Sequence, residues 1–127
     1  MIIPTLCVRD IDEAVDFMSD VLDFECASRW PRTKSFYAVM MRGDDELHLQ
    51  LIQPTSRKGC CAVTVVCDDV DERWEAFKAR GLVVPVRPES PVHEGPVDQT
   101  WGTREFYVDD PSGNTVVYQQ RVEAGAE

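Results

Sequence analysis

A four-residue pattern that occurs twice constrains the fold of this chain more than any other feature. Residues 10–13 read Asp-Ile-Asp-Glu, residues 69–72 read Asp-Val-Asp-Glu, and a short apolar run precedes each of them. An Asp followed three residues later by a Glu is typical of a helix that begins with a structure like a capping box. Three strand-like runs follow each predicted helix. Two copies in the same order argue against coincidence and predict a duplicated β-α-β-β-β unit.

The spacing of apolar residues predicts the elements of both copies. The predicted strands are residues 2–8, 24–30, 36–42 and 46–53 in the first copy, and 61–67, 82–86 and the two runs on either side of a turn at 110–114 in the second. The helical stripes are Ile11, Ala14, Val15, Met18, Val21 and Leu22 in the first copy, and Val70, Trp74 and Phe77 in the second. Gly81 is expected to end the second helix, and residues 87–100 to form an irregular loop.

These elements predict one α+β domain over residues 1–127, because there are too few helices for a doubly wound parallel sheet. Its expected parts are a first module at 1–53, a linker at 54–59, a second module at 60–121 and a frayed tail at 122–127. Each module is expected to form a small curved sheet backed by its helix. The concave faces are then available as a ligand cleft.

Composition limits the classes of partner. The net charge of −10 argues against binding to nucleic acid, although it suits a cationic ligand as well as plain solubility. No apolar run is long enough to span a bilayer, and the N-terminal residues lack the pattern of a secretory signal, so we expect no membrane partner and a cytoplasmic protein. The five cysteines include no C-x-x-C pair, which indicates small buried thiols in a reducing compartment.

Three stretches carry a resemblance to a known family. Residues 8–17, Val-Arg-Asp-Ile-Asp-Glu-Ala-Val-Asp-Phe, and the turn at 110–114, Asp-Pro-Ser-Gly-Asn, resemble the vicinal oxygen chelate superfamily of glyoxalase I, extradiol dioxygenases and bleomycin-resistance proteins. Residues 101–106, Trp-Gly-Thr-Arg-Glu-Phe, are similar to the bleomycin-resistance branch. The resemblance implies two βαβββ modules and a homodimer whose ligand pockets are lined by both subunits. Asp23 departs from the family, which commonly has Gly at the end of the first helix.

The resemblance also identifies four positions at which enzymes of the superfamily hold a metal ion, mostly with His and Glu. In this chain those positions are occupied by Ile3, Gln50, Ala62 and Val117. Of the four, Gln50 alone offers a ligand atom, and one amide oxygen does not hold a divalent ion. We therefore predict no metal and no other cofactor.

Candidate ligand-binding residues come from the resemblance and from strand alternation. In resistance proteins a Trp like Trp101 stacks on planar drug rings, and an aromatic residue like Tyr37 or Phe36 does the same. Alternation places Glu105 and Tyr107 on the concave side of one strand. The remaining candidates, which share one face of another strand, are His48 and Gln50.

Several of these residues also have a structural explanation. Trp101 suits a core or a dimer interface as well as a ligand, and we assign Trp30 and Trp74 to such structural roles. His48 suits a hydrogen-bonded rim position as well as a general base. His93 lies in the proline-containing loop and is expected to be solvated.

The sequence thus favours a metal-independent binding protein of the bleomycin-resistance type that sequesters a planar, cationic small molecule by mass action. The alternative is a metal-dependent lyase, dioxygenase or thiol transferase of the same superfamily. A third interpretation is an interaction or storage domain whose cavity is filled by its own side chains. Fold alone does not separate the three, because one architecture hosts them all.

Overall fold

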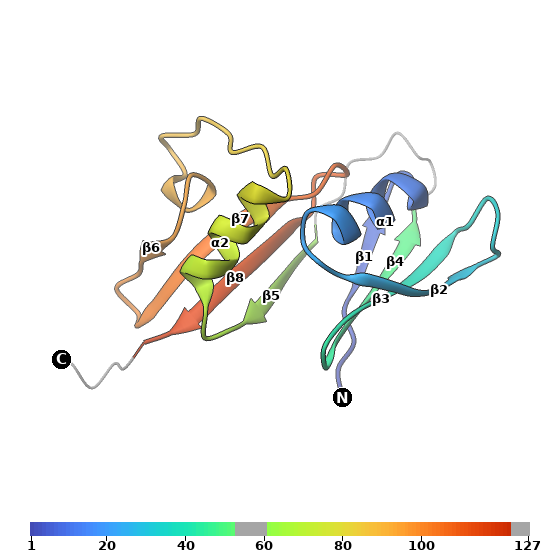
Figure 1. Ribbon diagram of the computed structural model, residues 1–127, viewed down its shortest axis with the longest axis horizontal. Helices are drawn as coiled ribbons and strands as arrows, with labels where there is room; N and C mark the ends of the chain where they lie inside the picture. Colours follow the sequence, from blue (N-terminus) through green and yellow to red (C-terminus); the bar gives the residue numbers. More distant parts are fainter. Residues whose placement is uncertain (53–60, 123–127) are drawn as a thin grey trace. The chain divides into compact units, whose positions relative to one another are not determined.

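The computed structural model describes residues 1–52 and 61–122 (Figure 1). The chain forms two compact units. The first comprises Met1–Ala62 and Asp109–Thr115, and the second comprises Val63–Val108 and Val116–Glu127. The predicted linker at 54–59 and almost all of the predicted tail lie outside the described residues.

The first unit contains a four-stranded mixed sheet in the order β1-β4-β3-β2. Its strands are β1 (Thr5–Val8), β2 (Glu25–Trp30), β3 (Tyr37–Arg42) and β4 (Asp45–Leu51). β1 runs parallel to β4, whereas β3 is antiparallel to both of its neighbours. The register is interrupted by a bulge in β2 between Cys26 and Ser28. All four strands were predicted, with ends that differ by at most three residues.

Helix α1 (Ile11–Asp20) packs on one face of this sheet (Figure 1). The N-cap residue Asp10 accepts a hydrogen bond from the backbone N–H of Glu13 at 2.9 Å, as the sequence pattern predicts. The buried stripe of the helix is Ile11, Ala14, Val15 and Met18. After the helix, Asp23 adopts φ of 63°, so an Asp takes the left-handed conformation that a Gly commonly provides.

The second four-stranded sheet has the order β5-β8-β7-β6. Its elements are β5 (Ala62–Val66), α2 (Val70–Ala79), the short 3₁₀ helix η1 (Pro91–His93), β6 (Val97–Asp98), β7 (Thr103–Asp109) and β8 (Thr115–Arg121). The two helices and two mixed sheets confirm the predicted α+β class and the duplicated unit.

An aromatic core lies in the second unit. The ring of Phe106 stacks on Tyr118 with centroids 5.0 Å apart, and Trp74 meets Phe106 edge-on at 5.0 Å. Phe77 contacts Phe106 and Tyr118 in the same edge-on manner. Offset and edge-on pairs are the geometries that aromatic quadrupoles favour, and each contributes about 0.5–1.5 kcal/mol beyond burial. The predicted assignment of Trp74 to the core is confirmed, since its side chain is 6% exposed.

Three local predictions in the second copy are wrong. Residues 82–86 form no strand, because Pro85 lacks a backbone donor, and Val83 and Val86 are 85% and 89% exposed. The strand β6 lies instead within residues 87–100, which were expected to be irregular.

At the start of α2, Asp69 makes no side-chain capping bond, and its carboxylate pairs with Arg73 at 2.8 Å. The N–H of Val70 donates to the side chain of Gln120 at 3.2 Å in place of a local cap.

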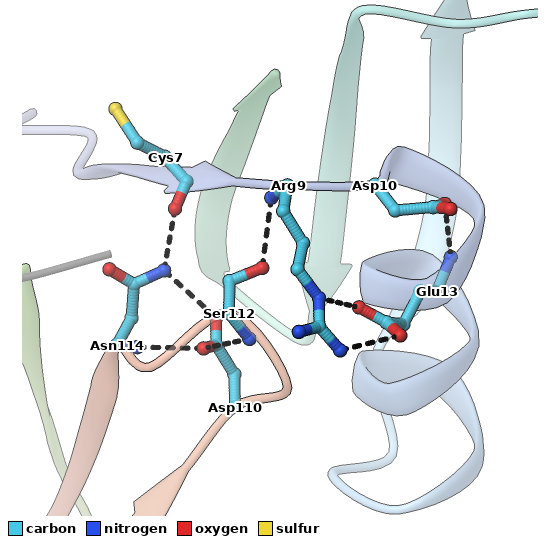
Figure 2. A network of polar contacts seen from close by, with 7 residues as sticks. All are labelled: Cys7, Arg9, Asp10, Glu13, Asp110, Ser112 and Asn114. Carbon is cyan, nitrogen blue, oxygen red and sulfur yellow. Dashed lines mark hydrogen bonds and ion pairs between the residues drawn. The ribbon is translucent and has the colours of Figure 1, made fainter. Parts of the chain in front are cut away.

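The turn Asp109–Thr115 belongs to the first unit although it connects the last two strands of the chain. Asn114 is 0% exposed, and its side-chain amide donates to the carbonyl oxygen of Cys7 at 2.7 Å (Figure 2). The amide oxygen accepts from the N–H of Cys61 at 3.0 Å. Ser112 accepts a hydrogen bond from the N–H of Arg9 at 2.9 Å. The turn is therefore a fixed part of the first unit rather than a solvated hairpin tip.

Asp110 organises the turn from within. Its carboxylate accepts the N–H groups of Ser112 at 2.9 Å and Asn114 at 2.7 Å, and also the amide of Asn114 at 3.0 Å (Figure 2). Burial raises the pKa of Asp110 above its ordinary value, and these hydrogen bonds oppose the rise only in part. Gly113 adopts φ of 94°, a conformation that only Gly takes without strain.

Candidate functional site

One face of the first sheet gathers three of the predicted ligand-binding residues: Tyr37, His48 and Gln50. Cross-strand partners point to the same side of a sheet, and Trp30, Tyr37 and Gln50 are such partners across β2, β3 and β4. The alternate residues Ala38 and Leu49 are buried beneath α1, so the row of three lies on the opposite face. This open face also carries His48, and Phe36 directly precedes β3.

Three side chains on the open face form a hydrogen-bonded chain, which we call the Tyr37 cluster: Tyr37, His48 and Glu46. The hydroxyl of Tyr37 lies 2.6 Å from Nδ1 of His48, and Nε2 of His48 lies 2.6 Å from a carboxylate oxygen of Glu46. The rings of Tyr37 and His48 meet edge-on at 5.3 Å. The side chains of His48 and Glu46 are 20% and 23% exposed, so solvent reaches these hydrogen-bonded groups.

Aromatic surface flanks the Tyr37 cluster. Trp30 is 69% exposed and Phe36 is 50% exposed. The N–H of Phe36 donates to the carbonyl oxygen of Trp30 at 2.9 Å, so the two backbones are linked at this end of the hairpin. Trp30 therefore does not lie in the core of its unit, because the cross-strand register turns it to the open face. The other structural role predicted for it, in a dimer interface, stays a prediction.

A hollow of about 510 Å³ lies along β2 and is lined by Cys26, Ala27, Ser28, Arg29 and Arg32. None of the predicted ligand-binding residues lines it. Two cationic side chains at its wall oppose a cationic ligand. The guanidinium of Arg29 also donates a hydrogen bond to the hydroxyl of Ser35 at 2.9 Å. We therefore place the candidate site at the side-chain clusters rather than in this hollow.

In the second unit, predicted residues gather around one buried carboxylate. We call this group the Glu105 cluster, and its members are Trp101, Thr103, Glu105, Tyr107 and Gln119. Glu105 is 3% exposed. One of its oxygens accepts from Thr103 at 2.6 Å, Gln119 at 2.9 Å and the indole of Trp101 at 3.3 Å, and the other accepts from the Tyr107 hydroxyl at 3.5 Å.

The electrostatics of the Glu105 cluster follow from this geometry. Burial raises the pKa of Glu105, but the hydrogen bonds, chiefly those from Thr103 and Gln119, lower it more, and the net pKa lies below the ordinary value. Burial and the neighbouring charge of Glu105 raise the pKa of Tyr107. At neutral pH the cluster therefore holds one buried negative charge, and Tyr107 remains a neutral phenol.

Trp101 is the exposed member of the Glu105 cluster. Its side chain is 65% exposed, so it does not cap the core of its unit. The indole N–H is held by Glu105, and this contact fixes the edge of the ring while its faces stay available for stacking.

His93 is buried, in contrast to the expectation that it is solvated. Its side chain is 8% exposed, and Nδ1 lies 2.7 Å from the hydroxyl of Ser90. The helix η1 turns the imidazole toward Tyr107, whose ring it meets edge-on at 5.5 Å. His93 thus packs against Tyr107, a member of the Glu105 cluster.

The residues at the superfamily's metal positions do not fit a metal ion. Ile3 and Val117 carry no donor atom, and the amide of Gln50 is the one ligand among the four positions. Among the residues that the structure describes, no three His, Cys, Asp or Glu side chains converge as a metal site would require. His48 and Glu46 are neighbouring side chains of types that bind metals, but Nε2 of His48 and a carboxylate oxygen of Glu46 are hydrogen-bonded to each other.

Sequence reasoning missed three residues of these clusters, Glu46, Thr103 and Gln119, and also Trp30, which flanks the Tyr37 cluster. Period-two alternation carries the signal for Glu46, which is two residues before His48 on the same strand, and for Thr103, which is two residues before Glu105. The contribution of Gln119 depends on the pairing of β8 with β7, and that of Trp30 on the register of β2. No local pattern encodes either pairing.

The comparisons with known proteins agree with this architecture. The family model of the Glyoxalase/Bleomycin resistance protein/Dioxygenase superfamily matches residues 3–118. The chain belongs to this superfamily. A search of curated proteins gives no match.

Solved structures of the superfamily share the fold. The chain is similar to a bleomycin-binding protein complexed with bleomycin, with 21% identity, a TM-score of 0.75 and coverage of 95% of this chain and 98% of that one. A bleomycin-binding protein from Streptomyces verticillus, complexed with copper(II)-bleomycin, has 24% identity, a TM-score of 0.70 and coverage of 96% and 95%. A lactoylglutathione lyase from Agrobacterium tumefaciens has 24% identity, a TM-score of 0.71 and coverage of 94% and 92%. At these identities the likeness establishes the superfamily fold alone.

The described helices are all too short or too polar to cross a membrane.

Proposed function

We propose that this chain is a metal-independent binding protein of the bleomycin-resistance type, which sequesters a planar, cationic small molecule. The observation that carries the proposal is the presentation of Trp101. Its indole edge is tied to a buried, ionised carboxylate, and 65% of the side chain faces solvent. A ring held in this way stacks on a planar ligand at low entropic cost, and its face attracts a cation.

The ligand class follows from the charges around the ring. Glu105 holds a negative charge at the indole edge of Trp101, and the chain as a whole carries a net charge of −10. A negative field of this kind increases the rate at which cationic ligands arrive and disfavours anions. The similarity to bleomycin-binding proteins supports bleomycin itself as the first ligand to test. Binding lowers the free concentration of the ligand, so resistance needs no chemical step.

The test is a titration of intrinsic tryptophan fluorescence with metal-free and copper-loaded bleomycin. We expect saturable quenching by both forms, and a loss of about fivefold or more in affinity in Trp101→Ala, because a stacked aromatic is worth about 1–3 kcal/mol. Val86→Ala is the matched control, since that side chain is 89% exposed and outside both clusters. Unchanged affinity in Trp101→Ala would overturn the proposal.

We also propose that the protein works as a homodimer, as the family resemblance implies. Exposed apolar side chains in the second unit support this, since Val66 and Val83 are 52% and 85% exposed. Sedimentation equilibrium at micromolar concentration is expected to give twice the chain mass of 14.4 kDa. A monomer at that concentration would count against shared pockets.

The alternative is a metal-dependent enzyme of the same superfamily, and the adjacent His48 and Glu46 are the observation in its favour. Both are ligand-type side chains on the open face of the first sheet. An enzyme needs at least one further protein ligand beside them. Titration with Zn²⁺, Ni²⁺ and Mn²⁺ under calorimetry, with His48→Asn as the control, distinguishes the two functions: stoichiometric binding abolished by the variant favours the enzyme.

A further inference from the structure

We propose that the Tyr37 cluster is a hydrogen-bond acceptor site, and that it binds an N–H donor group of the ligand at the hydroxyl oxygen of Tyr37. The inference rests on the proposed function, because it assumes that the open face of the first sheet contacts the ligand. It adds a requirement that stacking and charge do not impose: the ligand must carry an N–H group.

The polarity of the cluster follows from its two short contacts. An ionised carboxylate only accepts hydrogen bonds, so the proton between Glu46 and His48 belongs to Nε2 of the imidazole. A neutral imidazole carries one proton, and Nδ1 is then an acceptor. In that neutral state the hydroxyl of Tyr37 donates to Nδ1 across 2.6 Å. The Tyr37 oxygen therefore retains acceptor lone pairs and has no proton left to offer.

The carboxylate strengthens this acceptor. Hydrogen bonds to ionised groups are shorter and stronger than neutral ones, and members of a chain polarise one another. Glu46 makes no other polar contact within the described residues, so its charge acts through His48 on the phenol. The Tyr37 oxygen is thereby made more negative than that of an isolated tyrosine and prefers a donor such as an amino or amidine N–H.

The surroundings of Tyr37 allow such a ligand to reach it. Trp30 and Gln50 are its partners on the two neighbouring strands, and both are exposed. The Trp30 side chain offers a flat surface for a ring, and the Gln50 amide offers a second polar contact. A planar ligand with an amino group at its edge matches this row, with the ring toward β2 and the amino group at β3.

The test compares two planar cations that differ in their donors. 9-Aminoacridine at pH 8 is a cation with N–H groups, whereas 10-methylacridinium is a cation without one. Affinities are measured by fluorescence titration of wild type and Tyr37→Phe, which keeps the ring and removes the hydroxyl. We expect the affinity for 9-aminoacridine to fall by about three- to tenfold, the value of one hydrogen bond, and that for 10-methylacridinium to stay within about twofold.

A second measurement needs no ligand. The ¹⁵N shifts of the imidazole of His48 at pH 8 are expected to report a proton on Nε2, with the resonance assigned from the His48→Asn variant. Glu46→Ala removes the acceptor that fixes this proton, and is expected to shift the tautomer and to weaken 9-aminoacridine binding. Glu25→Ala is the matched control, since Glu25 is an exposed carboxylate in the same sheet. It is expected to change neither.

The outcomes separate this inference from the proposed function. Equal losses for both acridines in Tyr37→Phe, or a proton found on Nδ1 of His48, would overturn the acceptor site. The proposed function would survive if 10-methylacridinium still binds and Trp101→Ala abolishes that binding. Failure of wild type to bind either acridine or bleomycin would overturn both.

Discussion

Replacing Asn114 with Ala is expected to lower the free energy of unfolding by about 2–4 kcal/mol. The side chain is 0% exposed and makes three hydrogen bonds, to the carbonyl of Cys7, the N–H of Cys61 and the carboxylate of Asp110. Each bond is worth about 0.5–1.5 kcal/mol net, and a buried group left without a partner costs about 1–3 kcal/mol. The partners at Cys7 and Cys61 are half-buried, so water recovers part of that cost.

The assay is urea denaturation monitored by circular dichroism at pH 7, with Ser112→Ala as the matched control. Ser112 lies in the same turn and its side chain accepts one hydrogen bond, from the N–H of Arg9 at 2.9 Å. Its loss is expected to cost about 1 kcal/mol. If the slope of the unfolding free energy against urea concentration is the same in the variants as in wild type, the same amount of surface is exposed on unfolding in each protein. A cost below about 1 kcal/mol for Asn114→Ala would refute the view that this side chain anchors the turn.

The pH dependence supplies an independent check on the same substitution. Burial raises the pKa of Asp110, and the Asn114 amide opposes that rise by binding the ionised carboxylate. An acid with a raised folded-state pKa favours the folded state below its unfolded pKa, and that contribution is lost as pH rises through the folded pKa. Without the amide the raised pKa moves further up. The cost of Asn114→Ala is therefore expected to be larger at pH 7 than near pH 4, and an equal cost at both would contradict the role of Asp110.

Three further predictions concern the two units separately. Asp10→Ala is expected to cost about 1 kcal/mol in urea denaturation, and Asp69→Ala clearly less, because only Asp10 caps its helix; equal costs would contradict this difference. Phe106→Ala is expected to cost about 3–5 kcal/mol, because it removes a ring that the other aromatic side chains in the core of the second unit contact, and a cost near 1 kcal/mol would argue against that core. The pKa of Glu105 is lowered in the folded state, so its contribution to stability is present above its ordinary value of 4.5 and is lost as pH falls through the folded value. In urea denaturation measured at several pH values between 5 and 3, the free energy of unfolding of Glu105→Gln is expected to fall less steeply with decreasing pH than that of wild type. An equally steep fall in both proteins would refute the lowered pKa of Glu105.

Local patterns in the sequence predicted the order of the elements because the helices and most strands are amphipathic. The buried stripe of α1 and the alternation along β4 depend on periodicity alone. Residues 82–86 misled that reasoning: the apolar run reads as a strand, but Pro85 removes a donor and no neighbouring strand covers the run. The Asp69 cap failed for a different reason, because the repeated motif is present but its carboxylate binds Arg73.

The candidate site was harder to predict than the fold. Alternation placed Tyr107 with Glu105 and His48 with Gln50, and the structure brings each pair to one face. It did not reveal which side chains bind one another, since the contacts of Glu105 with Gln119 and of Tyr37 with His48 join different strands. Such contacts depend on strand register, which a single sequence does not state.

The turn that completes the first unit, Asp109–Thr115, follows most of the second unit in the chain. This has a consequence for how the two repeats can be separated. A polypeptide that stops after Ala62 contains every strand of the first sheet but lacks Asn114, so the backbone groups of Cys7 and Cys61 that it binds lose their partner. The first repeat therefore depends on a residue of the second and is not expected to fold fully without it. Recombination that shuffles one repeat without the other would separate each from hydrogen bonds it needs, and a split version of the protein would be expected to reassemble only when both pieces are made together.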